Sequence, residues 1–227
     1  MHFLSKLIAL SLSASTKNVA QTGQQHQLSW QELGEMLLDV QAQGIPDPVL
    51  MNTRFPSLPL SRLRVGASSV NEGAGRGVFA TQDCQEGDLL TCYPGDILLQ
   101  PTGFTPSPKD MGITDDDTLR DLMSRYCIGM TDEYAIMGLP ELDQDMAYAG
   151  HLINDGIASP PENEDQLEAY LKESQDKANA QLIPLENLHM VAIATKDIKK
   201  DEEVLIFYGP IYWMEHSSTW KGETPAP

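Results

Sequence analysis

The stretch VAIATKDIKKDEEVLIFYGPIYW, residues 191–213, holds two apolar runs separated by a charged segment. Residues 191–194 and 204–207 are rich in β-branched and aromatic side chains, which predicts a pair of short buried strands around a turn. Tyr208 ends the second run and is followed by Gly-Pro, so its hydroxyl is expected where a strand gives way to a loop. Such a tyrosine is either a core residue bonded to a backbone carbonyl or a site residue held by a rigid element.

The chain is acidic. Its 227 residues include 33 Asp and Glu against 15 Lys and Arg, a formal net charge of -18, and 41% are hydrophobic. This length predicts one domain with an extension, or two small domains. The charge disfavours direct binding to nucleic acid and favours a basic protein partner, such as a lysine-rich peptide. Acidity that only maintains solubility is the alternative.

The three cysteines, Cys84, Cys92 and Cys127, form no C-x-x-C pair. Free thiols in a reducing compartment are therefore expected, with no metal site, and the location is predicted as nuclear or cytoplasmic. Residues 1–15 have one lysine and a short apolar core, as in a weak signal peptide; no targeting role is the favoured alternative. No stretch approaches the ~20 apolar residues of a membrane span.

Residues 1–60 are predicted to form an N-terminal extension. A helix is expected at about residues 29–42, because apolar side chains recur at helical spacing and Ser29 with Glu32 forms a capping box. The apolar positions are Trp30, Leu33, Leu37 and Val40. Four prolines in residues 45–60 predict an extended linker.

The main domain is expected to begin near Ser61 with a strand at residues 62–65. Three glycines at spacing two, Gly73 to Gly77, favour a hairpin turn, with close backbone approach to a ligand as the alternative. Two further strands, at residues 88–93 and 96–99, are separated by Pro94-Gly95.

Acidic segments mark two expected helices. Residues 115–117 are all Asp and precede a predicted helix at residues 118–126, where they favour a solvated helix start over a metal site. Residues 133–137 predict another strand. A surface helix is expected within residues 157–180, with Asn163 as its N-cap. His151 lies between these two expected helices. Its side chain could be an acid–base group or a metal ligand, but a structural role is favoured.

Three separated segments match the motifs of a known family and follow one another in the same order. They are GRGVFA at residues 75–80 with Tyr93-Pro94-Gly95 behind it, HLIN at residues 151–154, and ATKDI at residues 194–198 running to EEVLIFYG at residues 202–209. Together they resemble the SET-domain family of protein lysine methyltransferases, over about residues 61–215. Order and spacing, more than any one segment, carry the resemblance.

The resemblance implies a mostly β fold with α insertions, in which short β-sheets surround a C-terminal pseudoknot and an N-terminal helical extension precedes them. It assigns residues 1–60 to the extension, 61–215 to the SET domain and 216–227 to a tail. Two inserts are expected within the domain, one like the family's SET-I segment at about residues 100–147 and an acidic helical one at about residues 157–178.

The resemblance also implies an activity, the transfer of methyl groups from S-adenosylmethionine to the side-chain amine of lysine in a protein, with a histone tail as one possible substrate. The alternative is an inactive module that binds basic proteins. The implied catalytic residues are Tyr208 and Tyr93. The implied cofactor-binding residues are Gly75, Arg76, Gly77, His151, Asn154 and Trp213, although Trp213 could equally be core. The implied walls of the lysine channel are Tyr134, Ile206 and Tyr93.

Several positions depart from the family pattern. Asp155-Gly156-Ile157 stands where the family has His-Ser-Cys, Phe207 where it has the Asp before the tyrosine, and Asp201 where it has Gly. The best match to the family's Pro-Asn-Ala, residues 178–180, follows the helical insert. No cysteine-rich segment follows residue 213, so the tail or the N-terminal helix is expected to close the channel. Ile206 has no hydroxyl, which predicts that higher methylation states are allowed.

Overall fold

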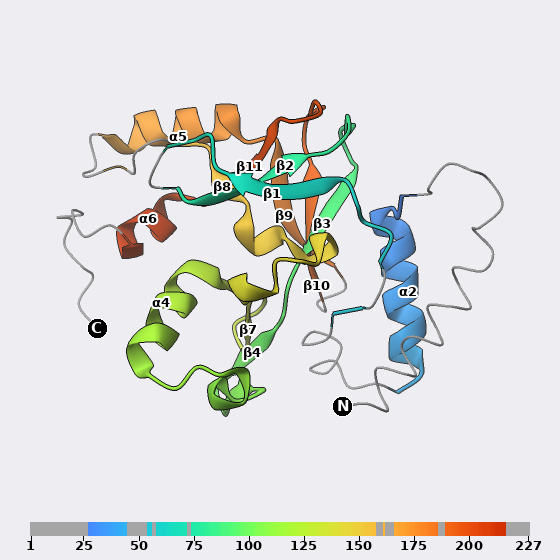
Figure 1. The fold of residues 1–227 in the computed structure, drawn as a ribbon, viewed down its shortest axis with the longest axis vertical. Coiled ribbons are helices and arrows are strands. Elements are labelled where there is room, and N and C mark those ends of the chain that lie inside the picture. Colours follow the sequence, from blue (N-terminus) through green and yellow to red (C-terminus); the bar gives the residue numbers. More distant parts are fainter. Residues whose placement is uncertain are drawn as a thin grey trace.

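A computed structural model describes residues 27–44, 54–55, 58–71, 74–157, 161, 166–185 and 189–216 (Figure 1). The signal-like residues 1–15, the predicted N-cap Asn163 and the tail after His216 lie outside the described residues, as does the side chain of Val40.

Eleven strands of the described chain form three small sheets. The first has the order β1 (Leu63–Ala67), β2 (Arg76–Ala80), β11 (Glu203–Ile206) and β8 (Asn154–Asp155). The second has the order β3 (Leu89–Tyr93), β10 (His189–Ala194) and β9 (Ala180–Leu185). The third has the order β5 (Gly103–Thr105), β4 (Ile97–Gln100), β7 (Ala135–Met137) and β6 (Cys127–Gly129).

Within the described residues, four α-helices and four short 3-10 turns accompany the sheets. The helices are α2 (Trp30–Ala42), α4 (Asp116–Tyr126), α5 (Leu167–Lys177) and α6 (Pro210–His216). The 3-10 turns are η1 (Pro108–Met111), η2 (Pro140–Leu142), η3 (Met146–Tyr148) and η4 (Gly150–Leu152). No helix in the described ranges is both long and apolar enough to cross a bilayer.

Strand β11 lies in the middle of the first sheet and joins distant parts of the chain. It pairs antiparallel with β2 and parallel with β8, where Leu205 faces Asn154 and Ile206 faces Asp155. The predicted mostly β fold of short sheets with α insertions is confirmed. A late strand sits between two earlier segments, which is consistent with the predicted C-terminal pseudoknot. Both strands expected in residues 191–207 form, but they lie in different sheets and do not pair with each other.

The hydrophobic core is divided between the sheets. All six residues of β10 are buried, which matches the apolar run at residues 191–194. Helix α2 packs on this sheet through Leu33 and Leu37, both fully buried. Its predicted capping box is confirmed, since the Glu32 carboxylate accepts from the Ser29 N–H at 2.8 Å and the Ser29 hydroxyl accepts from the Glu32 N–H at 3.2 Å.

The described part of the proline-rich segment packs against the domain. Phe55 is buried, and its backbone N–H donates to the Tyr148 hydroxyl at 2.8 Å. Arg54 forms a two-pronged ion pair with the Asp96 carboxylate, both distances being 2.7 Å. These residues therefore dock on the domain, because their side chains find specific buried partners there.

A buried carboxylate fixes the start of β11. The Glu203 side chain accepts from the Ser69 N–H at 2.6 Å and from the hydroxyls of Ser68 and Ser69 at 2.8 and 2.6 Å. It also accepts from the Asn154 amide at 3.3 Å. Gly77 in β2 makes room for it, because a Cβ there would lie 2.0 Å from the Glu203 Oε1.

We expect Gly77→Ala to destabilise the fold by about 1–3 kcal/mol, the usual cost of overpacking a buried site. The added methyl group would displace the Glu203 carboxylate from its four donors. Gly129→Ala in β6 is the matched control, since a Cβ there meets nothing within 4 Å. Denaturant unfolding of both variants measures the difference; equal stability would contradict the packing role of Gly77.

Candidate active site

Tyr208 lies two residues beyond the end of β11 and is held by both its side chain and its backbone. Its hydroxyl donates to the Ile153 carbonyl at 2.7 Å, and its N–H donates to the Asp155 Oδ2 at 3.2 Å. Burial, helped by the neighbouring Tyr212, raises the pKa of Tyr208, so the phenol keeps its proton. Parallel pairing of β11 with β8 is what brings these partners together.

Two aromatic rings from α6 cover Tyr208. The Tyr212 ring contacts it edge-on at 4.5 Å between centroids, and the Trp213 ring stacks on it at 6.1 Å. Gly209 has a φ of 91°, a left-handed conformation that turns the chain straight into α6. The segment over the tyrosine is thus α6, whereas α2 lies on the far side of the sheets (Figure 1).

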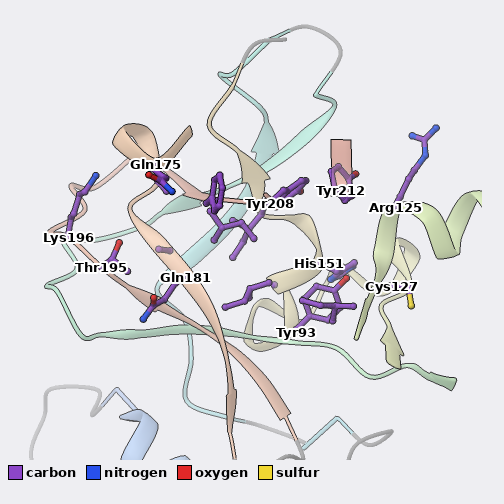
Figure 2. Close-up of a pocket in the computed structure, with 18 residues that line it drawn as sticks. Tyr93, Arg125, Cys127, His151, Gln175, Gln181, Thr195, Lys196, Tyr208 and Tyr212 are labelled. Carbon is purple, nitrogen blue, oxygen red and sulfur yellow. The ribbon is translucent and has the colours of Figure 1, made fainter. Parts of the chain in front are cut away.

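A cavity of about 590 Å³ opens beside Tyr208 (Figure 2). Tyr93, His151 and Tyr212 lie toward one end of it in Figure 2, and Thr195 and Lys196 toward the other. The remaining lining residues are Arg125, Cys127, Ile128, Gly150, Ile153, Gln175, Ala178, Ala180, Gln181, Leu182, Ile206 and Phe207.

In the part of the chain that the structure describes, no aspartate or glutamate lines this cavity. Its two permanent cations, Arg125 and Lys196, are bonded elsewhere: Arg125 pairs with Asp121 at 2.9 Å and Lys196 donates to the Asp176 carbonyl at 2.8 Å. The walls are mainly aromatic and aliphatic. Such a channel accommodates a methylene stem and favours the neutral form of an amine at its end, because desolvation disfavours the ammonium.

The glycine run leads into β2 and Asn154 lies in β8, the two neighbours of β11, and the two contact each other. The Asn154 amide donates to the Arg76 carbonyl at 2.8 Å. Gly75 has a φ of 68°, and the place where its Cβ would stand is open for 4 Å. The structure therefore brings together Gly75, Arg76, Gly77 and Asn154, none of which lines the cavity with Tyr93 and Ile206.

His151, predicted from the resemblance to bind the cofactor, lies instead at the Tyr93 end of the cavity. Its ring is edge-on to Tyr93 at 6.3 Å and to Tyr126 at 5.9 Å. Among the described residues neither ring nitrogen has a hydrogen-bond partner, and burial lowers the pKa of His151 to about 4. The imidazole is therefore neutral at physiological pH.

Two other predicted residues have structural contacts. Trp213 donates its indole N–H to the Asp155 Oδ2 at 3.1 Å while it stacks on Tyr208. Tyr134 packs against the core cluster that contains α2 and is not among the residues that line the cavity.

Asp155 is the member of this site that sequence reasoning missed. Besides the Tyr208 and Trp213 N–H groups, its carboxylate accepts from the hydroxyls of Tyr170, at 2.9 Å, and Ser174, both on α5. It thus joins α5, α6 and Tyr208. The signal available in the sequence was Tyr170 and Ser174 four residues apart on one face of the insert, but nothing indicated which group that face contacts.

A family model for the SET domain matches residues 75–209, more than half of the chain. The chain belongs to the SET-domain family. The match begins at Gly75 of the glycine run and ends directly after Tyr208, and so includes Asn154. SET domains are mostly protein lysine methyltransferases and typically bind S-adenosylmethionine. No curated protein matches the chain.

The low pKa of His151 predicts a pH-dependent stability for this SET domain. The unfolded chain takes up a proton near pH 6.5 but the folded one only near pH 4, so stability falls as pH drops across this window. Between pH 7 and pH 5 we expect a loss of about 2 kcal/mol more in the wild type than in His151→Asn. Denaturant unfolding at both pH values measures it; parallel losses in the two proteins would refute the assignment.

Proposed function

We propose that this SET-domain protein transfers methyl groups from S-adenosylmethionine to the side-chain amine of lysine in a protein substrate. One observation carries the proposal. The Tyr208 hydroxyl is fixed on the Ile153 carbonyl at the wall of a cavity that has aromatic walls and, within the described ranges, no carboxylate in its lining. This combination suits a long apolar stem ending in a neutral amine.

The hydrogen bond from Tyr208 determines what its hydroxyl can do for the substrate. Since its proton is donated to the Ile153 carbonyl, the phenolic oxygen presents lone pairs to the cavity. Lone pairs accept from the N–H groups of an amine and so orient the nitrogen's own lone pair. The raised pKa of Tyr208 keeps the hydroxyl protonated and this polarity fixed.

The rest of the lining suits the lysine stem. Tyr93, Leu182 and Ile206 supply an aromatic ring and two aliphatic side chains to the cavity. Burial also raises the pKa of Tyr93, which therefore stays neutral. A neutral apolar channel holds the lysine as free base, the form that has a lone pair to react.

The described residues fit the cofactor. The open space beside Gly75, and the Arg76 carbonyl held by Asn154, provide backbone that a ligand can approach. The aromatic cluster of Tyr208, Tyr212 and Trp213 suits a sulfonium, because ring faces attract cations. When bound, S-adenosylmethionine supplies an activated methyl group; the protein contributes position and exclusion of water.

The net charge of -18 favours a basic substrate, and we propose a lysine-rich protein such as a histone tail.

Asp155, in place of the family's histidine, favours a second candidate: an inactive SET module that binds basic proteins. Calorimetric titration with S-adenosylmethionine separates the two. Saturable binding supports the enzyme, and its absence would overturn the proposal in favour of the binding module.

Replacing Tyr208 with Phe should lower methyl transfer to a lysine-peptide array by at least about 100-fold, because the amine loses its orienting acceptor. Cofactor affinity should change little, since the ring remains. Tyr148→Phe is the control: it also removes a buried hydroxyl, one that accepts from the Phe55 N–H, but Tyr148 is not among the residues that line the cavity. Equal loss of transfer in both variants would indicate destabilisation instead of a role at the site.

Ile206 should permit more than one methyl group per lysine. It lines the cavity two residues before Tyr208 and offers no hydroxyl that could hold a water in the place of a methyl group. Mass spectrometry of the product should show di- or trimethyl-lysine, and Ile206→Tyr should shift it toward monomethyl-lysine. A wild-type product that stops at one methyl group would contradict this role.

A further inference from the structure

Asp155 is a buried carboxylate whose partners are all neutral. It is 4% exposed, and in the described part of the chain it accepts from two hydroxyls and two N–H groups but forms no ion pair. The N–H groups of Tyr208 and Trp213 can only donate, so the Oδ2 they share must act as an acceptor. These four neutral donors stabilise the Asp155 carboxylate by hydrogen bonding, but they do not neutralise its negative charge.

The position of the Asp155 carboxylate indicates which bound group its charge acts on. Asp155 bonds directly to the backbone of Tyr208, and the Tyr208 ring is one wall of the cavity. Asp155 also follows Asn154, which holds the glycine run on the cofactor side. Among the described residues no carboxylate lines the cavity, and Asp155 is an anion that bonds to the aromatic cluster through Tyr208 and Trp213.

We propose that Asp155 is the counter-charge for the sulfonium of S-adenosylmethionine and makes the site prefer this cation to its neutral thioether product, S-adenosylhomocysteine. This rests on the proposed function. The two ligands differ in one methyl group and one positive charge, so a buried anion acts on one and not on the other. A carboxylate that only held α5 and α6 in place would affect both equally.

Asp155→Asn tests the proposal because it removes the charge and can keep the hydrogen bonds. The amide oxygen can take the place of Oδ2, with its two N–H donors and the Tyr170 hydroxyl, while the amide N–H₂ donates to the Ser174 hydroxyl. Calorimetric titration should show about tenfold weaker binding of S-adenosylmethionine, equivalent to about 1.4 kcal/mol, and S-adenosylhomocysteine unchanged within about twofold.

Ser174→Ala is the matched control, since it removes one donor and leaves the charge; the ratio of the two affinities should stay that of the wild type. Equal weakening of both ligands by Asp155→Asn, or no weakening, would overturn the counter-charge. If Asp155→Asn does not fold, Asp155→His, neutral at pH 8, replaces it with the same expected loss of preference, and a retained preference overturns the proposal. A wild type that binds neither ligand would instead refute the proposed function.

Discussion

The two-residue parallel pairing between β11 and β8 is the constraint on which the rest of the site depends. It places Tyr208 beside the Ile153 carbonyl and the Asp155 carboxylate, although residues 153–155 and 208 are far apart in the chain. Because so short a ladder supplies little stability alone, side chains reinforce it. Asn179, directly after the helical insert, does so on β11: its amide donates to the Glu203 carbonyl and its oxygen accepts from the Leu205 N–H.

Buried carboxylates hold both ends of β11. Glu203 at its start ties the loop after β1 to Asn154, and Asp155 at its end ties α5 and α6 to Tyr208. Each accepts several hydrogen bonds, which offsets the cost of burying it. The acidic composition is therefore partly internal: at least two of the negative charges organise the site and are not available for solubility.

Local patterns in the sequence predicted local structure. The capping box at Ser29, the buried run at residues 191–194 and the helix expected at residues 118–126 each depend on near neighbours. Each formed, and the helix begins two residues earlier than expected, at Asp116. Partnerships between distant segments could not be predicted in this way. Nothing around Asp155 indicated that it would meet Tyr170 and Trp213, because hydrophobic period and turn chemistry carry no information on which insert packs on which strand. The glycine run and Tyr208 were found only because they resemble a family pattern in order and spacing.

The late position of β11 in the chain has a consequence for folding. Its partner Phe79 lies near the start of the domain, and Glu203 can pair with it only after the whole intervening chain has been ordered or looped out. Closing so long a loop is entropically costly and slows folding. Until it closes, Asp155 and Glu203 lack several of their donors, and Tyr208 lacks its acceptor. The site around Tyr208 is therefore assembled last, and during synthesis a nascent chain holds this site incomplete.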